Sequence, residues 1–279
     1  MAVNFGKAAH VLAVHGVQVG TDASIKSDDQ IRKLVGNSLA RSHLEREFEV
    51  PEFFYEDIND EAQKFHSLIA SAITSGEPLS KKVLQTVIDL VGDVVTAARD
   101  TSTAKTIRNN LRNKILQSFD DGHQLALVSH SLGTIYSLDV ITELMRDDAL
   151  FQGDDRTTWP VQGLITMGSP LGLDIEVGDT KIFEKRTIEA VPGTQFEVFP
   201  WHNYYNRLDP IVSGNVFGSP VEIKGTKGPV EQRYGADTMS SQWLLHGHVI
   251  TSGKQWLLAH TAYWKNPKIG DRIVDMLWG

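Results

Sequence analysis

The chain has 279 residues, of which 41% are apolar and 22% charged, with a formal net charge of −8. This length and composition fit a soluble globular protein, and we expect one domain spanning residues 1–279. Lys and Arg are scattered and there is no cysteine, so a nucleic-acid partner is not expected and disulfides, thiol nucleophiles and thiolate metal sites are excluded.

The N-terminal segment has neither the long apolar run nor the small-residue cleavage site of a signal peptide. No stretch approaches the roughly 20 apolar residues that a membrane-spanning helix needs. We therefore expect a cytoplasmic protein without a transmembrane segment. The oligomeric state is left open.

Short apolar runs, each followed by small or turn-forming residues, predict buried parallel strands. They are His10–Val14, Phe48–Tyr55, Gln124–Ser129, Gln162–Met167 and the more aromatic Glu197–Tyr205. Helical spacing of apolar residues predicts helices over Asp28–Arg46, Glu61–Thr74, Ser80–Arg99, Thr103–Phe119, Leu132–Met145 and Ile269–Trp278. Strands that alternate with helices predict an α/β fold, in which a mostly parallel sheet is flanked by helices.

The connection between the second and third predicted strands is much longer than an ordinary crossover. We expect a helical insertion between about residues 60 and 120. Its helix Ser80–Arg99 is either a cap or lid over a site or a surface helix packed on the sheet, and loop length does not separate the two.

The most informative segment is LALVSHSLGTIY at residues 125–136, where an apolar strand runs directly into a helical pattern. A sharp strand-to-helix turn pushes one side chain out at the edge of the sheet, and the residues two before and two after it must be small. Ser129 and Gly133 meet this requirement around Ser131. Ser131 is thus the candidate nucleophile, and the alternative is a simple helix cap.

This segment resembles the nucleophile elbow of the α/β-hydrolase superfamily, particularly its lipase-like and esterase-like members. Ser129 departs from the commoner Gly at its position. The run VLAVHGV near the N-terminus is similar to the family's first core strand, which ends in His-Gly. The resemblance implies an oxyanion hole made by the backbone N–H groups of Val17 and Leu132, with Gly16 allowing a tight turn and His15 orienting the loop.

Triad residues in this family follow the order Ser, Asp or Glu, then His. Residues 206–210 (NRLDP) match a frequent family pattern, N-x-x-D-P, which makes Asp209 the expected acid. Asp174 and Asp139 are competing carboxylates. An ordinary Asp-Pro turn is the alternative explanation for Asp209.

His260 is the expected base because it opens the segment HTAYWKNP before the last predicted helix. Family members carry a similar segment, H-x-x-Y-W-x-x-P, in which the His is catalytic. His246 and His248 are the alternatives, since chain order does not exclude them. His130, inside the elbow, is expected to pack against neighbouring strands.

These residues predict a serine hydrolase that cleaves a carboxylic ester, with a small-molecule or lipid ester as substrate and neither cofactor nor metal. An amidase, peptidase or acyltransferase with the same triad is one alternative, and a catalytically inactive binding module is another. Aromatic residues near the late motifs either wall an acyl pocket or pack in the core: Phe199, Trp201, Trp243, Trp256 and Trp264.

Overall fold

The computed structural model describes most of the sheet and the helices beside it. The described residues are 2–14, 27–53, 101–172, 175–177, 180–183, 195, 198–206, 208–209, 212, 245–250, 259–260 and 262–279. The predicted helices Glu61–Thr74 and Ser80–Arg99 lie outside these residues, so the cap between residues 60 and 100 stays a prediction.

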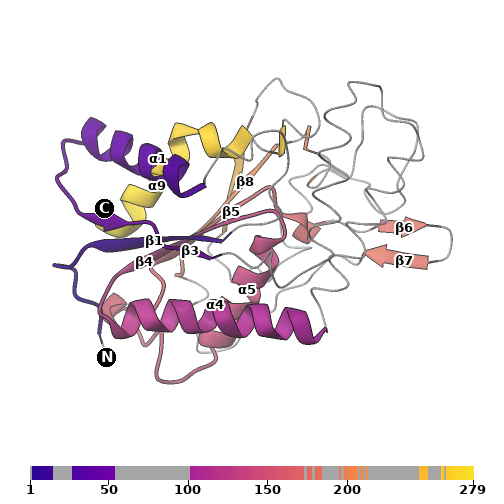
Figure 1. The fold of residues 1–279 in the computed structure, drawn as a ribbon, viewed down its shortest axis with the longest axis horizontal. Coiled ribbons are helices and arrows are strands. Elements are labelled where there is room, and N and C mark those ends of the chain that lie inside the picture. The colour runs from indigo at the N-terminus through magenta and orange to yellow at the C-terminus, as the bar shows by residue number, and fades with distance from the viewer. Residues whose placement is uncertain are drawn as a thin grey trace.

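A parallel sheet forms the centre of the protein (Figure 1). Its strands are β1 (Ala9–Val14), β2 (Phe48–Glu49), β3 (Glu52–Phe53), β4 (Leu125–His130), β5 (Gly163–Met167), β8 (Trp201–Tyr205) and β9 (Leu245–Val249). The order across the sheet is β2-β1-β4-β5-β8-β9, and β3 also pairs with β1. Every one of these pairings is parallel. The predicted α/β fold is confirmed.

The strand register brings the carboxyl ends of the central strands to one edge. Ser129 of β4 pairs with Val14 of β1 on one side and with Thr166 of β5 on the other. On the far side of β5, Met167 pairs with Tyr204 of β8. Segments that follow these strands therefore meet at the same edge, where open α/β sheets bind their ligands.

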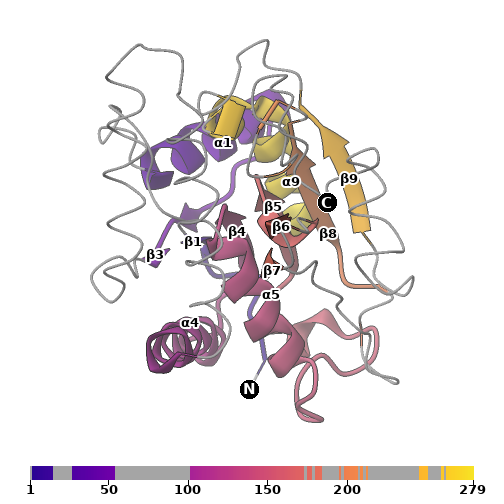
Figure 2. The same ribbon diagram turned by 90° about the vertical axis from the view of Figure 1, so that its right-hand side faces the viewer.

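Helices cover both faces of the sheet. They are α1 (Ser27–Arg41), α4 (Ser102–Asp120), α5 (Gly133–Leu144) and α9 (Pro267–Trp278). Figures 1 and 2 show α1 and α9 together on one face and α4 and α5 on the other. The end of the predicted insertion is thus α4, whose N-cap Thr101 accepts a hydrogen bond from the Ala104 N–H at 3.1 Å. None of the described helices is long and apolar enough to cross a membrane.

Two pairings were not predicted from the sequence. The edge strand β9 has the sequence LHGHV, which lacks a continuous apolar run. The antiparallel pair β6 (Ile175–Val177) and β7 (Thr180–Phe183) lies outside the main sheet. The described part of the predicted strand Phe48–Tyr55, residues 48–53, forms two short strands, because Val50 and Pro51 interrupt it and Pro has no N–H for the ladder.

The helices α1 and α9 pack very closely at Gly270. A Cβ on Gly270 would overlap the backbone carbonyl group of Leu34, which belongs to α1. The two helices form one apolar layer with the sheet, in which Ile31, Ile269 and Ile273 are completely buried. Gly270 therefore sets the distance between these helices, and α9 directly follows the segment that carries His260.

The substitution Gly270→Ala should lower the free energy of unfolding by roughly 1–3 kcal/mol, because the added methyl group has no space. Gly36→Ala is the matched control. It also lies inside a helix, but a Cβ there meets nothing within 4 Å, so it should raise stability by up to about 1 kcal/mol. Chemical denaturation of both variants is the measurement. Equal effects of the two would contradict the close approach.

Candidate active site

The backbone bends sharply between β4 and α5. Ser131 occupies this bend with φ of 53°, and the first residue of α5 is Gly133. A non-glycine residue with positive φ is uncommon and strained, and such residues concentrate at functional sites. The Ser131 N–H donates to the Met167 carbonyl at 2.9 Å, which holds the bend against the end of β5. The strand–turn–helix geometry expected around Ser131 is present.

Hydrogen bonds of buried hydroxyl groups stabilise the bend. The Thr134 hydroxyl donates to the Ser131 carbonyl at 2.6 Å and lies 2.8 Å from the Ser169 hydroxyl. Ser129 donates its hydroxyl to Ser137 of α5 at 2.8 Å. Each of these side chains is buried, so the hydrogen bonds offset the cost of removing the hydroxyls from water. The departure from Gly at position 129 is accommodated in this way.

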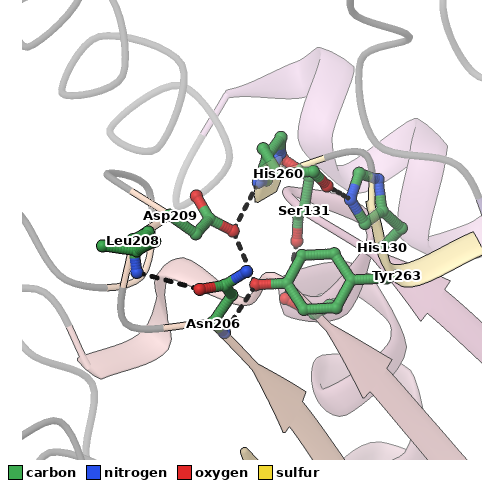
Figure 3. Close-up of polar contacts among 8 residues, drawn as sticks. His130, Ser131, Asn206, Leu208, Asp209, His260 and Tyr263 are labelled. Atoms are coloured by element: carbon green, nitrogen blue, oxygen red, sulfur yellow. Dashed lines mark hydrogen bonds and ion pairs between the residues drawn. The ribbon is translucent and has the colours of Figure 1, made fainter. Parts of the chain in front are cut away.

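Asp209 and His260 form a buried hydrogen-bonded pair (Figure 3). The His260 Nδ1 atom lies 2.8 Å from Asp209 Oδ2, and neither side chain is exposed to solvent. A turn after β8 places the carboxylate: Leu208 N–H donates to the Asn206 side chain at 2.9 Å, and Asp209 N–H donates to the Asn206 carbonyl at 3.0 Å. The structure thus brings together the two residues that the sequence predicts as acid and base, and their roles stay a prediction.

The contact with Asp209 determines the character of the other ring nitrogen of His260. A carboxylate accepts hydrogen bonds only, so the proton of the neutral ring lies on Nδ1 and the lone pair on Nε2. Nε2 is buried and has no hydrogen-bond partner among the described residues. An orphaned buried acceptor is uncommon and marks a functional candidate.

His130 links the bend to the segment that carries His260. Its Nε2 atom donates to the His260 backbone carbonyl at 2.8 Å, and the centroids of the two rings lie 4.6 Å apart. Figure 3 shows both histidines beside Ser131. The ring of His130 also lies against Tyr263 and Trp264. The position of His130 inside the elbow could be read from the sequence, but no sequence pattern indicated its contact with His260.

The alternative residues have other partners. His246 and His248 lie on the edge strand β9, where both rings stack on His202 of β8 and His248 Nε2 is 3.0 Å from His202 Nδ1. Burial is the main cause that lowers the pKa of His202 to about 3, with Arg272 adding to it. Asp139 pairs with Arg108 at 3.2 Å. The remaining competitor, Asp174, lies outside the described residues.

Two other predictions are only partly covered by the structure. Leu132 directly follows Ser131 and is buried, but His15, Gly16 and Val17 lie outside the described residues, so the oxyanion hole stays a prediction. Of the aromatic residues, Phe199, Trp201 and Trp264 are buried, whereas Trp243 and Trp256 are not described. No group of three potential ligands in the described part of the chain could hold a metal ion.

Comparisons with known proteins provide no family. No family model matches the chain, and no curated protein matches its sequence. Among solved structures, it is similar to "Phospholipase PlaB from Legionella pneumophila", with 14% identity and a TM-score of 0.29 over 60% of this chain. The chain spans about a quarter (26%) of the length of that protein. A likeness this distant carries no argument about activity.

Gly168 provides a test of how closely the His260 ring is packed. Its φ is +57°, and a Cβ there would lie 3.0 Å from His260 Nδ1 and 3.0 Å from the Tyr263 ring. Gly168→Ala should destabilise the protein by roughly 1–3 kcal/mol more than a control at a similar φ, because the methyl group displaces the His260 ring.

The control is Gly153→Ala, since Gly153 has φ of +50° but open space around a Cβ. The difference between the two variants in free energy of unfolding removes the backbone strain that they share. If that difference is zero, His260 is not packed against Gly168 as described.

Proposed function

We propose that the protein is a serine hydrolase of the α/β-hydrolase type that cleaves a carboxylic ester. The observation that carries the proposal is the buried Asp209–His260 pair. Its Nε2, which has no partner among the described residues, belongs to a segment hydrogen-bonded to the strained bend at Ser131. Ser131, His260 and Asp209 are the proposed nucleophile, base and acid. A serine hydroxyl is a weak nucleophile until such a base accepts its proton.

The proposed reaction has two halves. His260 Nε2 accepts the Ser131 proton while Oγ attacks the ester carbonyl carbon, and Asp209 stabilises the imidazolium that forms. The imidazolium then gives its proton to the leaving alcohol, and an acyl-enzyme remains. In the second half, His260 activates a water molecule that attacks the acyl-enzyme, which releases the carboxylic acid and restores the Ser131 hydroxyl. No cofactor takes part in this scheme.

The oxyanion formed in each half needs hydrogen-bond donors. We propose the backbone N–H groups of Leu132 and Val17, because Leu132 is the N-cap of α5 directly after the nucleophile and Val17 follows β1, the strand next to β4. One such donor contributes about 2.7–4 kcal/mol to the stabilisation of the transition state. The start of α5 adds a favourable electrostatic contribution for negative charge.

For the substrate, a lipid ester is the first class to test. The proposal rests on the resemblance of the sequence to lipase-like enzymes, which is an argument by analogy. p-Nitrophenyl esters of increasing acyl length provide the measurement. A rate that rises with acyl length supports a lipid ester, whereas a flat profile contradicts it and leaves a small ester as the substrate.

The nucleophile is tested by covalent labelling with a fluorophosphonate. Wild-type protein should be labelled at Ser131, and Ser131→Ala should lose both the label and esterase activity. Ser118→Ala is the matched control, since Ser118 is another buried serine but lies on α4, where its hydroxyl contacts His10 of β1. Wild-type protein that is well folded but neither labels nor hydrolyses esters would instead be an inactive binding module.

The acid is tested by Asp209→Asn. We expect kcat to fall by roughly 10⁴, because an amide in place of the carboxylate favours the wrong tautomer of the base. Asp139→Asn replaces a competing carboxylate and should change kcat only a few-fold. Steady-state ester hydrolysis by both variants, with Tm measured for each, separates the two. If kcat falls more in Asp139→Asn than in Asp209→Asn, the acid is Asp139 on α5 and not Asp209.

A further inference from the structure

Tyr263 contacts the proposed acid directly. It lies in the short 3-10 helix η5 (Ala262–Lys265), just after His260, and its side chain is completely buried. The phenol O–H donates to Asp209 Oδ2 at 2.7 Å (Figure 3). This is the same oxygen that faces His260 Nδ1 at 2.8 Å. Two donors therefore share one carboxylate oxygen.

The same phenol also holds the turn that carries Asp209. Its oxygen accepts a hydrogen bond from the Asn206 backbone N–H at 2.9 Å. Asn206 in turn accepts hydrogen bonds from Leu208 and Asp209. Tyr263 thus connects the segment of the base to the turn of the acid. Its hydroxyl acts both as a hydrogen-bond donor and as an acceptor.

We propose that Tyr263 is a positioning residue that fixes the orientation of the Asp209 carboxylate and sets how strongly it stabilises protonated His260. The inference rests on the proposed function, because Asp209 and His260 must act as acid and base for it to affect catalysis. Tyr263 acts through Oδ2, whose direction toward Nδ1 depends on the phenol donor.

The proposed role has an electrostatic consequence with a definite sign. A hydrogen bond from Tyr263 withdraws negative charge from Oδ2, so the carboxylate stabilises the imidazolium less than it would without that donor. Removing the phenol O–H should therefore let Asp209 stabilise the protonated form of His260 more strongly. Because the base must be neutral to accept the Ser131 proton, the acid limb of the pH–rate profile should move to higher pH.

If the ring of Tyr263 acted only through packing, Tyr263→Phe would leave the pH–rate profile unchanged. The ring packs beside Gly168 and lies edge-on to His260, with centroids 6.4 Å apart. Tyr263→Phe keeps these contacts and removes only the hydroxyl. Tyr204→Phe is the matched control, because Tyr204 is also buried and its hydroxyl donates to the Lys268 carbonyl at 3.2 Å.

The first test is ester hydrolysis across pH. In Tyr263→Phe we expect kcat to fall about 10- to 100-fold, because the Asp209 carboxylate loses the donor that fixes its orientation and a hydrogen bond to a charged group contributes in this range. KM should stay unchanged, and the acid limb of kcat/KM should shift to higher pH. Tyr204→Phe should show none of these changes. An unshifted acid limb in Tyr263→Phe, or the same shift in Tyr204→Phe, overturns the proposal.

A second test does not depend on activity. The proton on His260 Nδ1 should give a downfield resonance in the NMR spectrum of ¹⁵N-histidine-labelled protein. In Tyr263→Phe that resonance should move further downfield, because Oδ2 becomes a stronger acceptor, and in Tyr204→Phe it should not move. An unchanged resonance overturns the role of Tyr263. Wild-type protein that shows the resonance but no hydrolysis or labelling would instead refute the proposed function.

Discussion

The site depends on one backbone constraint, the left-handed conformation at Ser131. A strand that continued straight would leave this side chain among its neighbours in the sheet. The positive φ turns the chain directly into α5 and brings the side chain to the edge of the sheet. Such a conformation is strained by about 1–3 kcal/mol and persists only where the surroundings over-determine it. The hydrogen bonds from Thr134 and to Met167 supply that support.

The parallel sheet explains why distant segments meet at this bend. Asp209 follows β8 and Ser131 follows β4, and the register of β4, β5 and β8 places the ends of both strands at one edge. The third segment reaches the edge by another route. His260 precedes α9, whose start is fixed by the Asn266 cap at 3.0 Å from the Lys268 N–H and by the packing on α1. The segment that carries His260 is therefore anchored by helix packing.

Much of this arrangement could be predicted from residue types and their order. The runs that became β1, β4 and β5 are almost entirely buried, so they are mainly apolar and easy to recognise. The edge strand β9 was missed for the opposite reason: His246 and Val249 are exposed there, and an edge strand needs no continuous apolar run.

Within the site, the sequence indicated Ser131 by its small neighbours and Asp209 and His260 by family patterns. The contacts of His130 and Tyr263 could not be predicted in the same way. Each depends on which segments meet in space: His130 bonds a carbonyl 130 residues away, and Tyr263 bonds a carboxylate 54 residues away. Local patterns carry no information on such pairings.

The hydroxyl pair between Ser129 and Ser137 makes these two positions interdependent during evolution. The Ser129 hydroxyl donates its hydrogen bond to Ser137 on the next helix, so each of these buried side chains depends on the other. A substitution to Gly at position 129 alone would remove the hydrogen-bond partner of the buried Ser137 hydroxyl, which would lower stability by about 1–3 kcal/mol. Related sequences with Gly at the position of Ser129 should therefore carry a non-polar residue such as Ala at the position of Ser137. The two substitutions should appear together.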